Sequence, residues 1–475
     1  MIVPGPVETI HHQVSGGPGI IRRPARWPRF LGAYAVIHGI WLVMYALLGK
    51  GFAYAGFAHL YVGEVLLVLA GFALLNARRT VHLFNTPTGI LLTCFLAWQT
   101  ACMLPYLEIY GLDALRDSVI WAYAIFAWVT GALALRLSGF VKIAVARFVT
   151  FSKVFLVLGP TAFLASVYLR DWLPHWSDTS VSIPLVKGGE YCVHLAGIFA
   201  FVSVRLGRLS QWCLVPILAA AFLGMNVRGG LLAFMAAVGF SLLLRPRLER
   251  LALIFGASLL LIVAMAVVDL KIPTPKASRE FSLSQLTNSV ISMVSTTENT
   301  TLENTKKWRL MWWRKIWDYT VEGPYFWTGK GYGINLADSD GFQAGSKQEP
   351  LRSPHSSHLT LLARSGVPGF TLWVALQITW AGSMLIAHVR ARRRGLETWA
   401  SLFAWILTYW IAFMISAAFD VFLEGPMAGI PFWSLFGLGW GAQILFRSVL
   451  ERFRISQVAV PAQRPRFRSM SPRSA

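Results

Sequence analysis

The run "LALIFGASLLLIVAMAVV", residues 251–268, contains no charged residue. A membrane-spanning helix needs about 20 consecutive, mostly apolar residues, so this run is nearly long enough to cross a bilayer by itself. It is also typical of the chain, which has 475 residues, of which 55% are hydrophobic and only 14% charged. Soluble domains carry about 25% charged residues. The sequence therefore predicts an all-α polytopic membrane protein.

Similar apolar runs recur along the chain and predict about twelve transmembrane helices. These lie near residues 30–48, 58–76, 88–104, 118–136, 152–169, 190–204, 211–225, 229–244, 251–269, 367–388, 398–418 and 428–446. The predicted organisation is a disordered cytoplasmic tail (1–29), helices one to nine (30–269), a large outward loop containing short helices (270–357), helices ten to twelve (358–447) and a basic cytoplasmic tail (448–475).

The positive charge is distributed as in a membrane protein. The chain carries 43 Lys and Arg against 22 Asp and Glu, a formal net charge of +21. If the N-terminus is cytoplasmic, more than half of the basic residues fall in inward segments, which is the asymmetry of the positive-inside rule. This excludes nucleic acid as the reason for the charge and predicts that both ends of the chain are cytoplasmic.

The cysteines and histidines give little support for a metal site. Cys94, Cys102, Cys192 and Cys213 all fall in apolar runs, so they predict neither a disulfide framework nor a Cys-x-x-Cys metal site. A zinc site using two histidines remains an alternative, although a catalytic zinc usually has three protein ligands.

Those two histidines belong to "SPHSSHLTLLARSGVPGF", residues 353–370, at the predicted mouth of the tenth helix. An unpaired polar group at the edge of a bilayer is costly, so His355 and His358 are candidates for function. Further along, Asp420 and Glu424 in "AAFDVFLEGP" are predicted to lie on the same outer side. They are either a solvated helix end or groups that orient a histidine or a substrate.

The outward loop contains two more candidate segments. "NTKKWRLMWWRKIWDYTVEG" (304–323) predicts an amphipathic helix with a tryptophan-rich face, which as a whole suits a membrane interface. "WTGKGYGINL" (327–336) carries Gly329, Gly331 and Gly333, a run that allows close backbone approach and could cradle a phosphate. No strand-and-helix context supports a dinucleotide site there.

Arg228 is the one charged residue in "GMNVRGGLL" (224–232), which is predicted to be a tight outward turn between two helices. Arg228 is either a snorkelling arginine or a fork that binds a phosphate or diphosphate headgroup.

These motifs together resemble the O-antigen ligase and polymerase family of membrane glycosyltransferases. His355-Ser356, nine residues and then Gly366-Val-Pro-Gly369 match its histidine and G-x-x-G signature. The family's remaining features also occur in the same order along the chain. They are an arginine before the long loop (Arg228), an arginine followed by a tryptophan (Arg309 and Trp313) and the glycine-rich run. The layout of about twelve helices matches as well. Family members usually have an aromatic or aliphatic residue where this chain has His358.

The resemblance implies transfer of a glycan from an undecaprenyl-diphosphate carrier to an acceptor glycan or lipid A-core, on the periplasmic face of the bacterial inner membrane, without cofactor or metal. It implies His355 as the catalytic base. Arg228, Arg309, Gly329, Gly331, Gly333, His358, Asp420 and Glu424 are the predicted substrate-binding residues.

A polytopic transporter of lipid-linked or small solutes is the alternative function. An inverted repeat and broken helices would favour it, but no internal repeat is evident. Ionisable residues in mid-helix are sparse, the main ones being His38, Glu64 and His194.

Overall fold

The protein is represented by a computed structural model. It describes residues 27–57, 60–77, 81–177, 179, 181–207, 209–224, 227–246, 248–268, 271–273, 280–282, 284, 287, 300–344 and 350–458. Most of both predicted tails and parts of the predicted outward loop lie outside the described residues.

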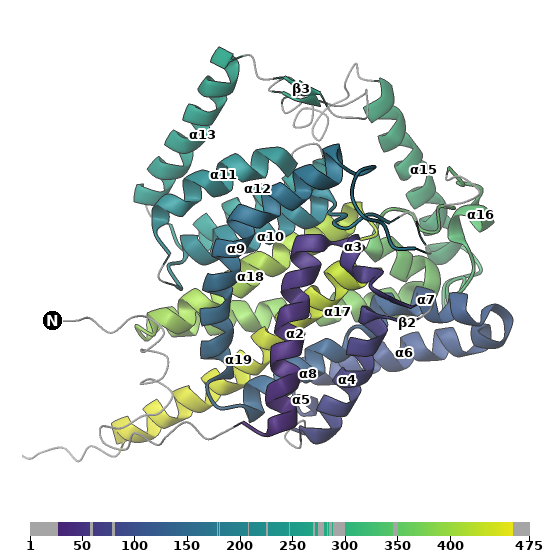
Figure 1. The fold of residues 1–475 in the computed structure, drawn as a ribbon. Helices are drawn as coiled ribbons and strands as arrows, with labels where there is room; N and C mark the ends of the chain where they lie inside the picture. The colour runs from purple at the N-terminus through teal and green to yellow at the C-terminus, as the bar shows by residue number, and fades with distance from the viewer. Residues whose placement is uncertain are drawn as a thin grey trace, which may run out of the picture.

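Each of the twelve predicted apolar runs coincides with a helix or a pair of helices. Figure 1 shows how these helices are arranged. The helices up to the long loop are α2 (Arg29–Leu48), α3 (Lys50–Ala53), α4 (Val62–Asn76), α5 (Val81–Phe84), α6 (Pro87–Tyr110), α7 (Leu112–Ala122), α8 (Ile125–Arg136), α9 (Phe140–Tyr168), α10 (Gly188–Ser203), η1 (Gln211–Cys213), α11 (Leu214–Leu223), α12 (Arg228–Leu244) and α13 (Leu248–Val268). After it come α15 (Thr300–Val321), α16 (Leu336–Asp340), α17 (Ser357–Arg393), α18 (Glu397–Phe419) and α19 (Pro426–Val458).

The chain is thus an all-α membrane protein. Among the described residues, six segments are long and apolar enough to cross a membrane: Arg29–Leu48, Pro87–Tyr110, Leu112–Arg136, Leu251–Val268, Ser357–Arg393 and Glu397–Phe419. Twelve transmembrane crossings remain a prediction. The last helix runs to Val458, beyond the predicted boundary at 447.

Strands are confined to two short antiparallel hairpins in the described part of the chain. β1 (Gly56–Phe57) pairs with β2 (Leu60–Tyr61), and β3 (Ile272–Pro273) pairs with β4 (Glu280–Phe281). In Figure 1, β3 lies at the top between α13 and α15, whereas α19 ends at the bottom.

Small residues bring the central helices together. An added Cβ on Gly437 of α19 would lie 2.3 Å from the Ala127 carbonyl oxygen of α8, and one on Gly441 would lie 2.6 Å from Ala134 Cβ. Close approach through small residues is the usual way in which membrane helices pack. α10 lies at the centre of the bundle, because every one of its residues is buried.

The predicted amphipathic helix of the loop is confirmed as α15. Its Trp312 and Ile316 are fully buried against Leu336 of α16 and Leu362 of α17. The Trp312 ring stacks on Phe342 with centroids 5.4 Å apart. The apolar face of α15 therefore packs on the protein itself, and the helix is fixed above the start of α17.

α17 is kinked at Gly366, whose φ of 67° and ψ of −173° are not helical. Only glycine adopts that conformation readily, and an added Cβ would lie 2.3 Å from the Phe326 carbonyl oxygen. Gly366, the first glycine of the G-x-x-G motif, thus divides α17 into a short segment before it and a longer segment after it. The longer segment begins at residue 367, where the tenth transmembrane helix was predicted to begin.

Candidate active site

His355 occupies a strained backbone position just before α17. Its φ is +53°, one of two positive values found for non-glycine residues in the described chain. Such a conformation costs about 1–3 kcal/mol and is concentrated at functional sites. The next residue, Ser356, caps the helix by accepting a hydrogen bond from the Leu359 N–H. His355 thus lies directly before the N-cap residue of α17, outside the helix.

The His355 imidazole faces Asp420, the residue directly after α18. His355 Nδ1 lies 3.6 Å from Asp420 Oδ1, slightly beyond hydrogen-bonding distance. Nδ1 is buried and makes no hydrogen bond to any described residue, whereas the side chain as a whole is 28% exposed. Nε2 is therefore the nitrogen available to a substrate.

Asp420 is held in place from both sides. Its Oδ1 accepts a hydrogen bond from the Val421 N–H at 2.8 Å. The Ser357 hydroxyl donates to the Asp420 carbonyl oxygen at 3.3 Å and accepts from the Leu423 N–H at 3.0 Å. These bonds attach the turn after α18 to the first residue of α17, beside His355.

The charge of Asp420 is maintained by its surroundings. Burial alone would raise the pKa of the carboxyl, but the Lys187 ammonium and the neighbouring His355 hold it well below its ordinary value. Conversely, burial alone would lower the pKa of Lys187, but the carboxylates of Asp420, Glu190 and Glu424 raise it. Asp420 and Lys187 are therefore both ionised at neutral pH.

α15, which carries Arg309, and the start of α12, which carries Arg228, both pack against the end of α18. On α15, Arg309 Nη1 donates to the Phe419 carbonyl oxygen at 2.9 Å, and Trp313 Nε1 donates to the Pro354 carbonyl oxygen at 2.8 Å. Arg228 begins α12, where an added Cβ on Gly229 would lie 3.1 Å from Phe419 Cβ. Arg309 thus contacts the end of α18 directly, and the backbone of α12 beside Arg228 packs on the same residue, Phe419.

Glu424 belongs to the same turn but bonds to α17. The Thr360 hydroxyl donates to Glu424 Oε1 at 2.8 Å. Burial raises the pKa of the Glu424 carboxyl, and the Thr360 bond opposes this in part. The contacts of Glu424 are thus with the first turn of α17, while Asp420 is the carboxylate next to His355.

Both ring nitrogens of His358 form hydrogen bonds within the protein. Trp373 Nε1 donates to His358 Nδ1 at 3.2 Å, so the proton lies on Nε2, which donates to the Met414 carbonyl oxygen at 3.0 Å. This neutral imidazole ties α17 to α18. In this arrangement neither of its nitrogens is available to a substrate or a metal.

The glycine run packs against the protein. The N–H groups of Lys330 and Gly331 donate to the carbonyl oxygens of Ala363 and Arg364, and the Gly333 N–H donates to Asp117 Oδ2. Gly329, Gly331 and Gly333 all have positive φ. These contacts explain the glycines without a phosphate and do not involve His355. Phosphate binding by this run stays a prediction.

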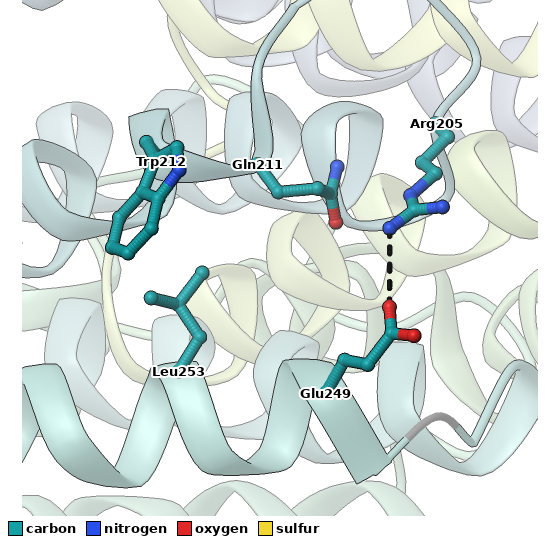
Figure 2. Close-up of a pocket in the computed structure, with 5 residues that line it drawn as sticks. All are labelled: Arg205, Gln211, Trp212, Glu249 and Leu253. Atoms are coloured by element: carbon teal, nitrogen blue, oxygen red, sulfur yellow. Dashed lines mark hydrogen bonds and ion pairs between the residues drawn. The ribbon is translucent and has the colours of Figure 1, made fainter.

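Two further observations concern metals and cavities. Among the described residues, no group of three or more His, Cys, Asp or Glu is placed to hold a metal ion. A cavity of about 390 Å³ lies elsewhere in the protein, and it is lined by Arg205, Gln211, Trp212, Glu249 and Leu253. Figure 2 shows these five side chains. None of the candidate site residues lines this cavity.

Lys187 is the residue that the sequence analysis missed. It lies immediately before α10 in the triplet Lys187-Gly188-Gly189. The triplet Arg228-Gly229-Gly230 repeats the same pattern, a cation and two glycines, at the start of α12. The repetition of this pattern was the available signal.

Comparison with known proteins supports the predicted family. Residues 212–374 match the O-antigen ligase family. The match includes Arg228, Arg309, the glycine run and both histidines, but not Lys187, Asp420 or Glu424. No curated protein sequence matches the chain. Residues 212–374 therefore resemble an O-antigen ligase domain, in agreement with the predicted family.

Proposed function

We propose that the protein transfers a glycan from an undecaprenyl-diphosphate carrier to a sugar hydroxyl, either on a growing polysaccharide or on lipid A-core. The observation that supports this proposal is the approach of His355 to Asp420 and of Arg309 to the Phe419 carbonyl oxygen at the end of α18, where the first turn of α12, which begins at Arg228, also lies. This arrangement supplies a base, a carboxylate and two cations near the end of a membrane helix, where the carrier's headgroup would lie.

Each group has one chemical task in the proposed reaction. His355 Nε2 takes the proton of the acceptor hydroxyl, a role that suits a pKa near ambient pH. The hydroxyl oxygen attacks the anomeric carbon while the bond from that carbon to the diphosphate oxygen breaks. The bonding electrons stay on the lipid diphosphate. One displacement of this kind inverts the configuration of the anomeric carbon.

The leaving group needs charge stabilisation, because it departs as an anion. Arg228 and Arg309 are assigned to the diphosphate, since a guanidinium presents paired donors to phosphate oxygens. Asp420 stabilises the imidazolium that forms on His355. No step uses a metal or a cofactor. The reaction is assigned to the periplasmic face of the bacterial inner membrane, in accordance with the charge asymmetry of the chain.

The two histidines test the assignment. In membranes supplied with lipid-linked glycan, we expect His355→Ala to abolish transfer and His358→Ala to reduce it only partly, because His358 holds helices together. A chelator should leave the wild-type rate unchanged. Equal loss in both variants together with inactivation by chelator would instead indicate a metal site. Transfer at the wild-type rate by His355→Ala would show that His355 is not the base.

A further inference from the structure

Arg205 has a left-handed backbone at the end of α10, with φ +54°. The Arg205 N–H donates to the Val202 carbonyl oxygen at 3.0 Å, and the Leu206 N–H donates to the Phe201 carbonyl oxygen at 3.4 Å. These two bonds form the Schellman motif that ends many helices. Glycine usually takes the left-handed position of this motif, because it has no Cβ. An arginine in that position directs attention to what its side chain does.

The Arg205 side chain lines the cavity of about 390 Å³. This volume falls within the range of small-molecule sites, about 300–1,000 Å³. In Figure 2, Arg205 and Glu249 lie on the right, Gln211 lies in the centre, and Trp212 and Leu253 lie on the left. The cavity is therefore polar at one end and apolar at the other.

The polar end holds donors and acceptors that the protein does not use. Arg205 Nη2 lies 3.4 Å from Glu249 Oε2, and neither side chain makes another hydrogen bond to a described residue. The Gln211 amide nitrogen donates to the Val202 carbonyl oxygen, but its buried Oε1 accepts no hydrogen bond from any described residue. A guanidinium can bind an anion, and the carboxylate and amide oxygens can accept from a cation.

The apolar end continues along one face of α13. Leu253 lies four residues after Glu249, and Leu260 and Val267 follow at intervals of seven, so all four share a helix face. The Leu260 and Val267 side chains are 68% and 79% exposed. Only 11% of the span Leu251–Val268 is buried, the smallest share among the six candidate spans. In a bilayer this face would lie against acyl chains.

We propose that the cavity binds the headgroup of an ethanolamine phospholipid. The phosphate binds Arg205, the ammonium binds Glu249 and Gln211, and an acyl chain follows the exposed face of α13. A headgroup with both charges matches both members of the Arg205–Glu249 pair, whereas a purely anionic headgroup would leave Glu249 facing a negative charge. Trp212 suits the interfacial level between the headgroup and the chains.

This lipid site is separate from the candidate active site. The start of α10 packs on α18, where an added Cβ on Gly189 would lie 3.5 Å from Ser416 Oγ. The helix has 16 residues and is therefore about 24 Å long, and Arg205 follows its other end. The inference thus does not depend on the proposed glycan transfer.

The test is native mass spectrometry of the intact protein, delipidated in detergent and titrated with phosphatidylethanolamine or phosphatidylglycerol. We expect wild-type protein to bind phosphatidylethanolamine about fivefold more tightly, the upper range for one exposed ion pair. Glu249→Gln should abolish this preference by weakening the binding of phosphatidylethanolamine alone. Arg205→Gln should weaken the binding of both lipids, because both carry a phosphate.

The Arg314–Asp318 pair on α15 provides matched controls, since its side chains are also exposed, by 70% and 48%. Asp318→Asn removes the same charge as Glu249→Gln, and Arg314→Gln removes the same charge as Arg205→Gln. Both control variants should bind the two lipids as the wild-type protein does. Changes equal to those of the cavity variants would mean that binding follows net charge, and the proposal would be wrong.

Arg205→Gly separates lipid binding from folding. Glycine suits the left-handed position, so the delipidated variant should melt at least as high as the wild type, yet bind phosphatidylethanolamine about fivefold more weakly. Wild-type binding by Arg205→Gly would mean that Arg205 only ends α10. Equal binding of both lipids by the wild-type protein would mean that the cavity does not select a zwitterionic headgroup. Either result overturns the proposal.

Discussion

His355 and His358 are three residues apart, but their side chains have different surroundings. His355 has a left-handed backbone and faces Asp420, while His358 is hydrogen-bonded at both nitrogens to Trp373 and Met414. The sequence motif singled out His355 and left the role of His358 open. The difference arises from residues that are distant in the chain, so spacing alone does not reveal it.

Arg228 provides a prediction at the same scale. Arg228→Lys keeps the charge but loses the planar fork that binds a diphosphate through paired bonds. We expect a substantial loss of transfer, tenfold or more (about 1.4 kcal/mol), with normal protein level. Arg228→Ala should be at least as severe. Full polymer output from Arg228→Ala would mean that the residue is only a membrane anchor.

The glycine run allows a matched comparison. Gly331 has φ +77°, and an added Cβ would lie 2.0 Å from Tyr106 Cε2, whereas Gly341 has φ +75° with nothing within 4 Å. Both alanine variants incur the backbone cost of about 1–2 kcal/mol, but only Gly331→Ala also meets a clash. We expect a clearly lower melting temperature for Gly331→Ala than for Gly341→Ala.

A phosphate cradle makes a different prediction for that pair. The clash with Tyr106 would remain, but folded Gly331→Ala would also have a raised KM for the donor, which Gly341→Ala would not. That outcome would restore the functional interpretation of the run.

At the scale of elements, the sequence predicted the helices better than their partners. The tryptophan-rich pattern of 304–323 identified α15 and its apolar face. It suggested a membrane interface, whereas Trp312 is buried against α16 and Phe342. Amphipathic periodicity identifies a face that must be covered, but the covering surface comes from segments that pattern analysis treats separately.

The ion pairs around α15 give a prediction with an internal control. Lys330 Nζ contacts Asp340 Oδ1 in a pair whose side chains are 9% and 0% exposed, while the Arg314–Asp318 pair is 70% and 48% exposed. Removing one partner of a buried pair costs about 3–5 kcal/mol, and an exposed helical pair contributes about 0.3–0.5 kcal/mol. Lys330→Met should therefore lower the free energy of unfolding far more than Arg314→Met. Equal effects would show that Asp340 is not buried as described.

At the scale of the whole molecule, hydropathy was sufficient to locate the helices, because each apolar run coincides with one. Helix ends were less predictable: α19 continues through charged residues to Val458. The site was partly predictable, since His355, Arg228 and Arg309 are in family motifs. Lys187 and the pairing of Asp420 with His355 depend on how α10, α12 and α18 converge, and local sequence does not specify that convergence.

The orientation in the membrane is the remaining prediction, and the mechanism depends on it. A lipid-linked glycan presented outside the cytoplasm can reach His355 only if the segment from α13 to α17 lies on the outer face. Gln343 in this segment and Arg392 at the end of α17 are both exposed. They are thus suitable for single cysteines in a variant from which the four native cysteines have been removed.

Intact cells treated with a membrane-impermeant thiol reagent distinguish the two orientations. We expect labelling of Gln343→Cys and no labelling of Arg392→Cys until the cells are lysed, when both should react. Arg392 belongs to a basic group at the end of α17, Arg390, Arg392, Arg393 and Arg394, and such a group favours the cytoplasmic side. Labelling of Arg392→Cys but not Gln343→Cys in intact cells would place His355, Asp420 and both arginines on the cytoplasmic face. The proposed transfer from an outward-facing carrier would then be impossible.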